Sequence, residues 1–155
     1  MKLANALSQR SELQTRIRQL ESRLNNNAQV QEGERPAEDP IELLKELDGD
    51  YARLEELISA INRTNNSTQA GDGTTLSDLL ARRDCLKGKL SILRGFLNSA
   101  SALVRRHSVG EIKIRSTVNV RKLQKQVDGL SRELRELEET IQEKNWTGTM
   151  PGWRS

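Results

Sequence analysis

The sequence predicts an all-α protein: four long helices pairing as antiparallel coiled-coil helical hairpins, with a minor two-stranded β element. Apolar residues recur in alternating steps of three and four along four segments, the heptad spacing of helices that share a narrow apolar seam. Apolar residues are only 34% of the chain and aromatic residues 3%, whereas 30% are charged. Such a composition suits elongated helix pairs better than a compact globule. We expect one helical domain over residues 1–147 and a flexible C-terminal tail over 148–155.

The first two predicted helices cover residues 3–27 and 40–65. The second should begin sharply, because Asp39 can cap it and Pro40 suits a first helical turn. In the first helix the predicted seam runs from Leu3 and Ala6 to Leu24, and in the second from Leu44 to Ile61. The seam residues that we expect to pack within the chain or between copies are Leu13, Ile17, Leu20, Leu24, Leu47, Leu54 and Ile58, with Tyr51 on the same predicted stripe.

The third predicted helix begins at Thr75, where Thr75 and Asp78 resemble a capping box, and the fourth covers residues 120–145. Both keep the three-and-four spacing throughout. Their expected packing residues are Leu86, Leu90, Leu93, Leu130, Leu134 and Leu137.

The connections carry two further predictions. Residues 111–118 alternate charged and β-branched side chains, the period of a strand, and residues 28–32 are the expected partner, in this chain or in another copy. Residues 66–74 are interpreted as a turn. Because this turn is short, and because the second helix is net acidic and the third net basic, we expect these two helices to form an antiparallel hairpin.

The seams supply mostly two apolar residues per heptad, fewer than a four-helix bundle within one chain usually needs. This indicates a homo-oligomer in which other copies complete the packing. Arg10 and Arg83 interrupt the seams. They predict either a polar layer that binds an anion or sets register, or two side chains whose stems line the seam while their heads reach water or a carboxylate such as Asp48 or Glu55.

No constellation of residues typical of catalysis, metal binding or cofactor binding stands out, so we expect no enzyme activity, metal or cofactor. His107 is the only histidine and suits a helix C-terminus, and Cys85 is expected to be a small buried side chain within a helix. The segment MKLANALSQR lacks a secretory apolar run, and no stretch reaches the roughly 18 apolar residues that cross a bilayer. We therefore expect a cytoplasmic protein without membrane contact.

The strongest basic feature lies between residues 105 and 125. If one helix end gathers Arg105, Arg106, Lys113 and Arg115, they could contact phosphates. Nucleic-acid binding is therefore the alternative to a structural role, although no aromatic side chains are interleaved for base stacking.

Several stretches together resemble a bacterial family of uncharacterised proteins that is often labelled septicolysin: MKLANAL, NNNAQVQEGERPAEDP, INRTNNST, EIKIRSTVNVRKLQKQVDGL and IQEKNW. The resemblance covers nearly the whole chain. It implies a helical, oligomeric protein, a dimer or a hexamer built as a trimer of dimers, with no established activity or catalytic residues. The label suggests a thiol-activated cytolysin, but the single mid-helix cysteine and the scarcity of aromatic residues argue against such a pore former.

A polar run at the end of the second helix exceeds what helix capping requires. Asn62, Arg63 and Asn65 form either a hydrogen-bonded corner at the tip of a hairpin or a contact with a partner chain. The sequence thus predicts an uncharacterised structural or interaction protein that assembles through its helices.

Overall fold

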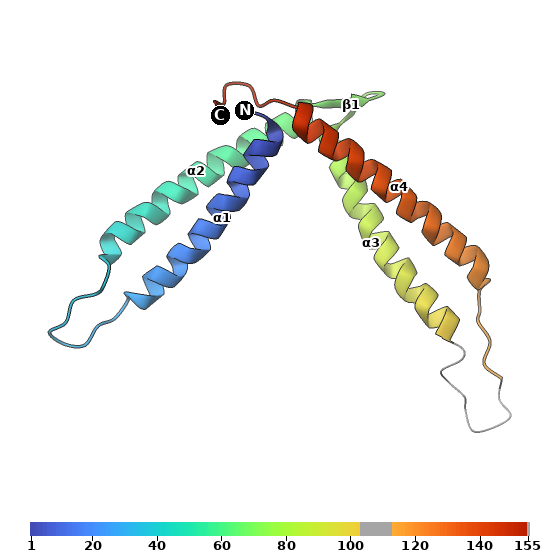
Figure 1. The fold of residues 1–155 in the computed structure, drawn as a ribbon, viewed down its shortest axis with the longest axis horizontal. Helices are drawn as coiled ribbons and strands as arrows, with labels where there is room; N and C mark the ends of the chain where they lie inside the picture. Colours follow the sequence, from blue (N-terminus) through green and yellow to red (C-terminus); the bar gives the residue numbers. More distant parts are fainter. Residues whose placement is uncertain (103–112, 155) are drawn as a thin grey trace. The chain divides into compact units, whose positions relative to one another are not determined.

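Four long helices dominate the computed structural model, which describes residues 1–102 and 113–154 (Figure 1). They are α1 (Leu3–Asn26), α2 (Pro40–Ser67), α3 (Leu76–Ser101) and α4 (Val120–Thr147). The all-α prediction is confirmed, and each predicted helix is found within a few residues of its expected bounds. None of the helices in the described ranges is long and apolar enough to span a bilayer.

A small sheet lies between α2 and α3 in the sequence. It pairs β1 (Gln69–Gly71) with β2 (Thr74–Thr75). Asp72 and Gly73, the two residues between the strands, have φ angles of 49° and 77°. A two-residue loop with positive φ at both positions matches the twist of a hairpin, and Asp-Gly favours it. The hydroxyl of Thr74 also donates to the carbonyl oxygen of Gly71 at 2.6 Å.

The β element is therefore confirmed, but its predicted place was wrong. Residues 28–32 form turns and irregular backbone, and residues 113–118 contain no strand; residues 111 and 112 lie outside the described ranges. A strand needs a hydrogen-bonded neighbour. The turn at Asp72-Gly73 brings β1 beside β2, so each strand has a neighbour. Residues 113–118 have the alternating pattern of a strand but no neighbouring strand within the described ranges.

The chain divides into two compact units, one formed by residues 1–69 with 144–155 and the other by residues 70–143. In the first unit α1 packs along α2, and in the second α3 packs on α4. The predicted hairpin of the second and third helices was wrong. α1 is basic where it faces α2, so α2 finds opposite charge on α1. Whether the two units fold as one domain stays a prediction.

The α1–α2 seam buries side chains from both helices. On α1 it follows the expected positions: Leu3, Ala6, Leu13, Ile17 and Leu20 are buried, and Leu24 is half-buried. On α2 the buried stripe is shifted by one residue at alternate positions. It comprises Leu43, Asp50, Leu54, Leu57, Ala60, Ile61 and Thr64, with Leu47 half-buried.

The shift in α2 corrects the predicted seam. Leu44 and Tyr51 were expected inside the pair but are 47% and 54% exposed, and Ile58 is half-buried. Both candidate stripes have three-and-four spacing and share Leu47, Leu54 and Ile61. The sequence alone favoured the wrong one because the true seam includes a carboxylate, Asp50, at a position where an apolar residue is usual.

The α3–α4 seam follows the expected positions throughout. Leu86, Leu90, Leu97 and Val127 form a buried cluster. Partly buried residues pack against it: Leu93, Val120, Leu123, Leu130 and Leu134. Leu137 and Ile141 continue the seam of α4 and are buried.

Two helices begin with the predicted side-chain caps. Asp39 accepts a hydrogen bond from the amide of Ile41 at 3.0 Å, next to Pro40 in the first turn of α2. At the start of α3, Thr75 and Asp78 form a reciprocal capping box. These contacts satisfy amides that have no partner within the helix.

The segment that follows α4 makes specific contacts with the first residues of the chain, and its expected flexibility stays a prediction. Thr149 forms an antiparallel bridge with Lys2, and Met150 is 2% exposed. The amide of Met150 donates to the carbonyl oxygen of Met1 at 2.9 Å. The buried Met150 side chain thus anchors this segment to the first unit.

Candidate functional site

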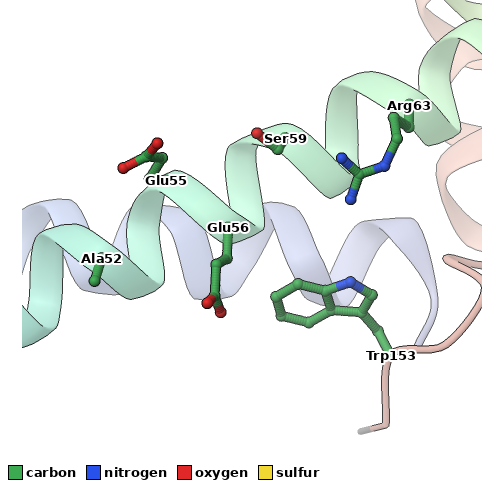
Figure 2. A pocket seen from close by; sticks show the side chains of 6 residues that line it. All are labelled: Ala52, Glu55, Glu56, Ser59, Arg63 and Trp153. Atoms are coloured by element: carbon green, nitrogen blue, oxygen red, sulfur yellow. The ribbon is translucent and has the colours of Figure 1, made fainter.

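Side chains of α2 and of the segment after α4 line an open groove on the first unit. Its volume is about 440 Å³, and Figure 2 shows the six side chains that line it. They are Ala52, Glu55, Glu56, Ser59, Arg63 and Trp153. A smaller hollow of about 200 Å³ shares Arg63 and Trp153 with it and reaches the buried Met150.

The N-terminus holds Trp153 in place. The amino group of Met1 donates to the carbonyl oxygen of Trp153 at 2.7 Å. Figure 2 shows the indole beneath the end of the Arg63 side chain, with Glu56 further along the helix. The groove thus brings an aromatic ring beside charged groups of both signs.

The polar run that we singled out borders this groove. Asn62 and Arg63 are exposed, and Asn65 is half-buried. Thr64 between them is buried and donates its hydroxyl hydrogen to the carbonyl oxygen of Ala60 at 2.8 Å. Of the three candidate contacts, only Arg63 lines the groove. Trp153 was missed by the sequence reading, because its segment was interpreted as a flexible tail.

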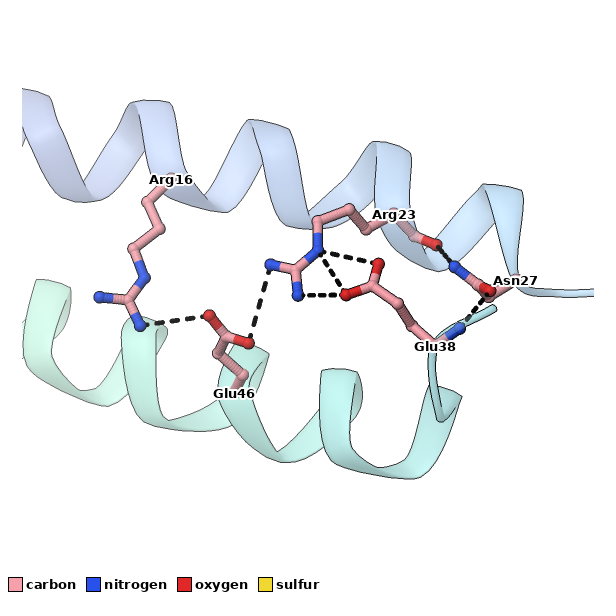
Figure 3. A network of polar contacts seen from close by, with 5 residues as sticks. All are labelled: Arg16, Arg23, Asn27, Glu38 and Glu46. Atoms are coloured by element: carbon pink, nitrogen blue, oxygen red, sulfur yellow. Dashed lines mark hydrogen bonds and ion pairs between the residues drawn. The ribbon is translucent and has the colours of Figure 1, made fainter. Parts of the chain in front are cut away.

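A second polar cluster joins α1 to the start of α2 (Figure 3). The Arg23 guanidinium contacts both carboxylate oxygens of Glu38, with its closest nitrogen at 2.6 Å. The amide of Glu38 donates to the side-chain oxygen of Asn27 at 2.9 Å, and the side-chain amide of Asn27 donates to the carbonyl oxygen of Arg23 at 2.8 Å. Arg16 and Arg23 both approach Glu46, at 3.2 and 3.8 Å.

These contacts shift two pKa values in the directions expected for an ion pair. The hydrogen bond with Arg23 lowers the pKa of Glu38, and the same bond raises the pKa of Arg23. Because every member of the cluster is used in closing the α1–α2 hairpin, we assign the cluster to the fold. Arg16 also pairs with Asp50 in the seam at 3.2 Å.

The two arginines in the seams are both half-buried. Arg83 contacts the carboxylate of its neighbour Asp84 at 3.0 Å, rather than Asp48 or Glu55. That arrangement, with a stem along the seam and a head at a carboxylate, matches one of the two alternatives we left open for Arg83. An anion-binding role for Arg10 and Arg83 stays a prediction.

The basic candidates fall partly outside the described ranges. Arg105 and Arg106 lie there, as does His107. Lys113 and Arg115 are exposed on irregular backbone that leads toward α4. Cys85, which we expected to be buried, is exposed, because it lies on the side of α3 away from α4.

Each hairpin carries exposed apolar residues on the outer flank of one helix. We define the α2 stripe as Leu44, Tyr51 and the half-buried Ile58, which recur every seven residues beside the α1–α2 seam. We define the α3 stripe as Ile92 and Phe96, which lie one turn apart on the exposed side of α3. Ile92 is 74% exposed and Phe96 44%. Tyr51 and Phe96 are the only tyrosine and the only phenylalanine in the chain.

A hollow of about 310 Å³ adjoins the α2 stripe. It is lined by Tyr51 together with Ile17, Glu21, Leu24, Asn25 and Leu47. Leu24 and Leu47 are the two half-buried leucines of the α1–α2 seam. The seam is thus open to solvent next to the exposed tyrosine, which widens the apolar surface available there.

Comparisons with known proteins agree with this architecture. Residues 10–150 match the model of a family of unknown function, DUF6847. A functionally unknown conserved protein from Corynebacterium diphtheriae has a crystal structure that is similar, with a TM-score of 0.89. It is 39% identical, and the alignment covers 96% of this chain and 97% of that one. No curated protein matches the chain, and nothing in these comparisons links it to the septicolysin label.

Proposed function

The chain belongs to the DUF6847 family of unknown function, and we propose that it is a structural or interaction protein that assembles with copies of itself through heptad-patterned helices. One observation carries this proposal. Apolar residues of α2 and α3 lie outside both seams on the α2 and α3 stripes, where Leu44, Tyr51, Ile92 and Phe96 are exposed and Ile58 is half-buried. Exposed apolar residues that gather on one flank are a mark of interaction sites.

The aromatic residues strengthen the argument. The chain has four of them, and the tyrosine and the phenylalanine both lie on the stripes. Aromatic side chains are enriched at protein interfaces because they bury a large area at a small cost in conformational entropy. None of the four aromatic residues is buried, and two of the exposed ones lie on the stripes, which favours a role in association.

The grooves support recognition more than catalysis. The polar groups of the Arg63 groove lie on an open helix face, where water competes for every contact. A catalytic site needs convergent groups in a concave, shielded pocket. We therefore propose a role without enzymatic activity. We place this role in the cytoplasm, as we expect from the sequence.

Sedimentation velocity across the micromolar range tests self-assembly. The proposal predicts a dimer or a larger closed oligomer whose population increases with concentration. A helical, folded species that sediments as a monomer at every concentration would refute it.

Nucleic-acid binding is the second candidate, favoured by the exposed basic residues at the start of α4. Lys113, Arg115, Arg121, Lys122 and Lys125 are all exposed within thirteen residues of sequence. A gel shift with duplex DNA and with RNA tests it. Phosphate binding predicts a shift that weakens steeply as salt rises, and the absence of any shift at low salt would exclude it.

A further inference from the structure

The α2 and α3 stripes differ in the charge beside them. On α2, Asp48 and Glu55 lie one step around the helix from the stripe, and both are exposed. On α3, Lys89 lies on the stripe itself, seven residues before Phe96. Within residues 1–102 and 113–154, none of these three side chains has an ion-pair partner within 4 Å. The two stripes are therefore apolar surfaces with complementary, unused charges.

Their shapes are also complementary. Gly88 and Gly95 lie next to the α3 stripe, and a Cβ atom built on either would have no heavy atom within 4 Å. The flank of α3 beside Ile92 is therefore uncovered, and no side chain projects from it at these two glycines. Tyr51 projects from the middle of the α2 stripe, with Leu44 and Ile58 seven residues to either side. An aromatic ring on one helix facing small residues on another allows the two backbones to approach closely.

We infer that the α2 stripe of one copy of this chain packs against the α3 stripe of a second copy. The inference rests on the proposed self-assembly and names the surfaces that perform it. Tyr51 of one copy lies over the glycine-lined flank beside Ile92 of the other. The opposite charge that favoured pairing of α2 with α3 in the sequence is then satisfied between chains, since α1 and α4 occupy the seams within each chain.

The seven-residue periods fix the charge contact in either direction. If Tyr51 lies opposite Ile92 in antiparallel helices, Glu55 lies within a turn of Lys89. If the helices are parallel, Asp48 lies opposite Lys89. Either arrangement places a carboxylate against the free ammonium group, which favours this pairing over parallel α3 with α3, where Lys89 would meet Lys89.

Every copy carries both stripes, so the contact is between unlike surfaces. Two copies that exchange both contacts make a two-fold dimer. Copies that each bind a different neighbour make a ring where the rotation between copies closes, and an open filament where it does not. All of these assemblies use the same pair of stripes.

A complementation experiment with the full chain tests the inference. Tyr51→Glu disables the α2 stripe, and Ile92→Glu disables the α3 stripe. Both side chains are exposed, so circular dichroism should show unchanged helicity for each variant. Thr15→Glu, at an exposed position of α1, adds the same charge elsewhere and serves as the control.

Each stripe variant alone should self-associate more weakly than the wild type, by on the order of 30-fold or more in Kd, because each contact needs one intact stripe of each kind. The control should assemble as the wild type does. An equimolar mixture of the two variants should form a complex, because the intact α2 stripe of Ile92→Glu meets the intact α3 stripe of Tyr51→Glu. Sedimentation velocity with one variant fluorescently labelled reads this complex directly.

Other outcomes overturn the inference in recognisable ways. If Tyr51→Glu alone still assembles and Ile92→Glu does not, α3 pairs with α3; the reverse result means that α2 pairs with α2. If both variants assemble as the wild type does, other surfaces join the copies and the proposed function survives without this contact. If the wild type is a monomer at every concentration, the inference and the proposed self-assembly fail together.

Discussion

The register of α2 makes a prediction that two adjacent leucines can test. Leu43 is 3% exposed in the α1–α2 seam, whereas Leu44 is 47% exposed on the α2 stripe. Truncating a buried leucine to alanine removes its transfer free energy and leaves a cavity, at a cost of about 2 to 5 kcal/mol. Because Leu43 lies in the first turns of α2, where the seam can partly collapse, we expect Leu43→Ala to cost about 2 to 3 kcal/mol of unfolding free energy.

Leu44→Ala is the matched control, since it removes the same atoms from the same turn of the helix. About half of the Leu44 side chain already contacts water, so its truncation should cost less than roughly 1 kcal/mol. Urea unfolding followed by circular dichroism, at a protein concentration low enough to keep the chain monomeric, measures both. If Leu44→Ala proves the more costly of the two, the register of α2 and the exposure of its stripe are wrong.

Three further predictions concern polar residues. Asp50→Leu should leave the urea midpoint unchanged or raise it, because Asp50 is 7% exposed in an apolar seam and its partner Arg16 remains solvated; a clearly lower midpoint would contradict this. Thr75→Ala should cost about 1 kcal/mol by removing the capping box of α3, whereas Thr117→Ala, outside any helix, should leave the thermal midpoint in place. Arg23→Gln should raise the pKa of Glu38 toward its ordinary value in a carboxyl NMR titration, and an unchanged pKa would show that Arg23 does not lower it.

The Glu38 pair also sets the direction of a pH effect. Since the folded-state pKa of Glu38 is lowered, the pair stabilises the fold at pH values above the unfolded-state pKa of the carboxyl. That contribution disappears as the pH falls through the folded-state pKa. Both Arg23 and Glu38 are well exposed, so the difference between wild type and Arg23→Gln should be small at neutral pH and absent in acid.

Much of the fold could be predicted from heptad spacing alone. In α3 and α4 one stripe of apolar residues dominates, so the positions from Leu86 to Leu97 and from Val127 to Ile141 could be placed before the structure. In α2 two stripes compete. The apolar one, with Leu44 and Tyr51, faces solvent, and the one interrupted by Asp50 faces α1. Arg16 makes the buried carboxylate tolerable, and no rule of spacing foresees that partner.

The pairing of the helices was harder to predict than the helices themselves. Opposite charge on the second and third helices favoured a hairpin, but α1 offers α2 the arginines Arg16 and Arg23 as well. The connector after α1 reverses the chain through Asn27 and Glu38, whose mutual contact depends on three-dimensional placement. By contrast, Asp72-Gly73 is a sequence signal for a two-residue β-hairpin loop. Residues 66–74 could therefore have been predicted as a β-hairpin and not only as a turn.

The candidate surfaces could be predicted only in part. Arg63 was named from the sequence, but Trp153 follows α4 and reaches the groove through contacts of the N-terminus. The α2 stripe was visible as a heptad pattern and was assigned to the interior. Exposure is a property of the assembled pair of helices, so the same pattern could mark either a core or an interface.

The pairing of α1 with α2 underlies the exposed α2 stripe and the contact proposed for it. Spin labels at the exposed positions Thr15→Cys and Arg53→Cys, in a Cys85→Ser background, measure it by double electron–electron resonance. With labelled chains diluted into unlabelled protein, only distances within one chain contribute. Adjacent antiparallel helices predict a narrow distribution below roughly 25 Å. A broad distribution centred well beyond that distance would show that α2 does not lie along α1.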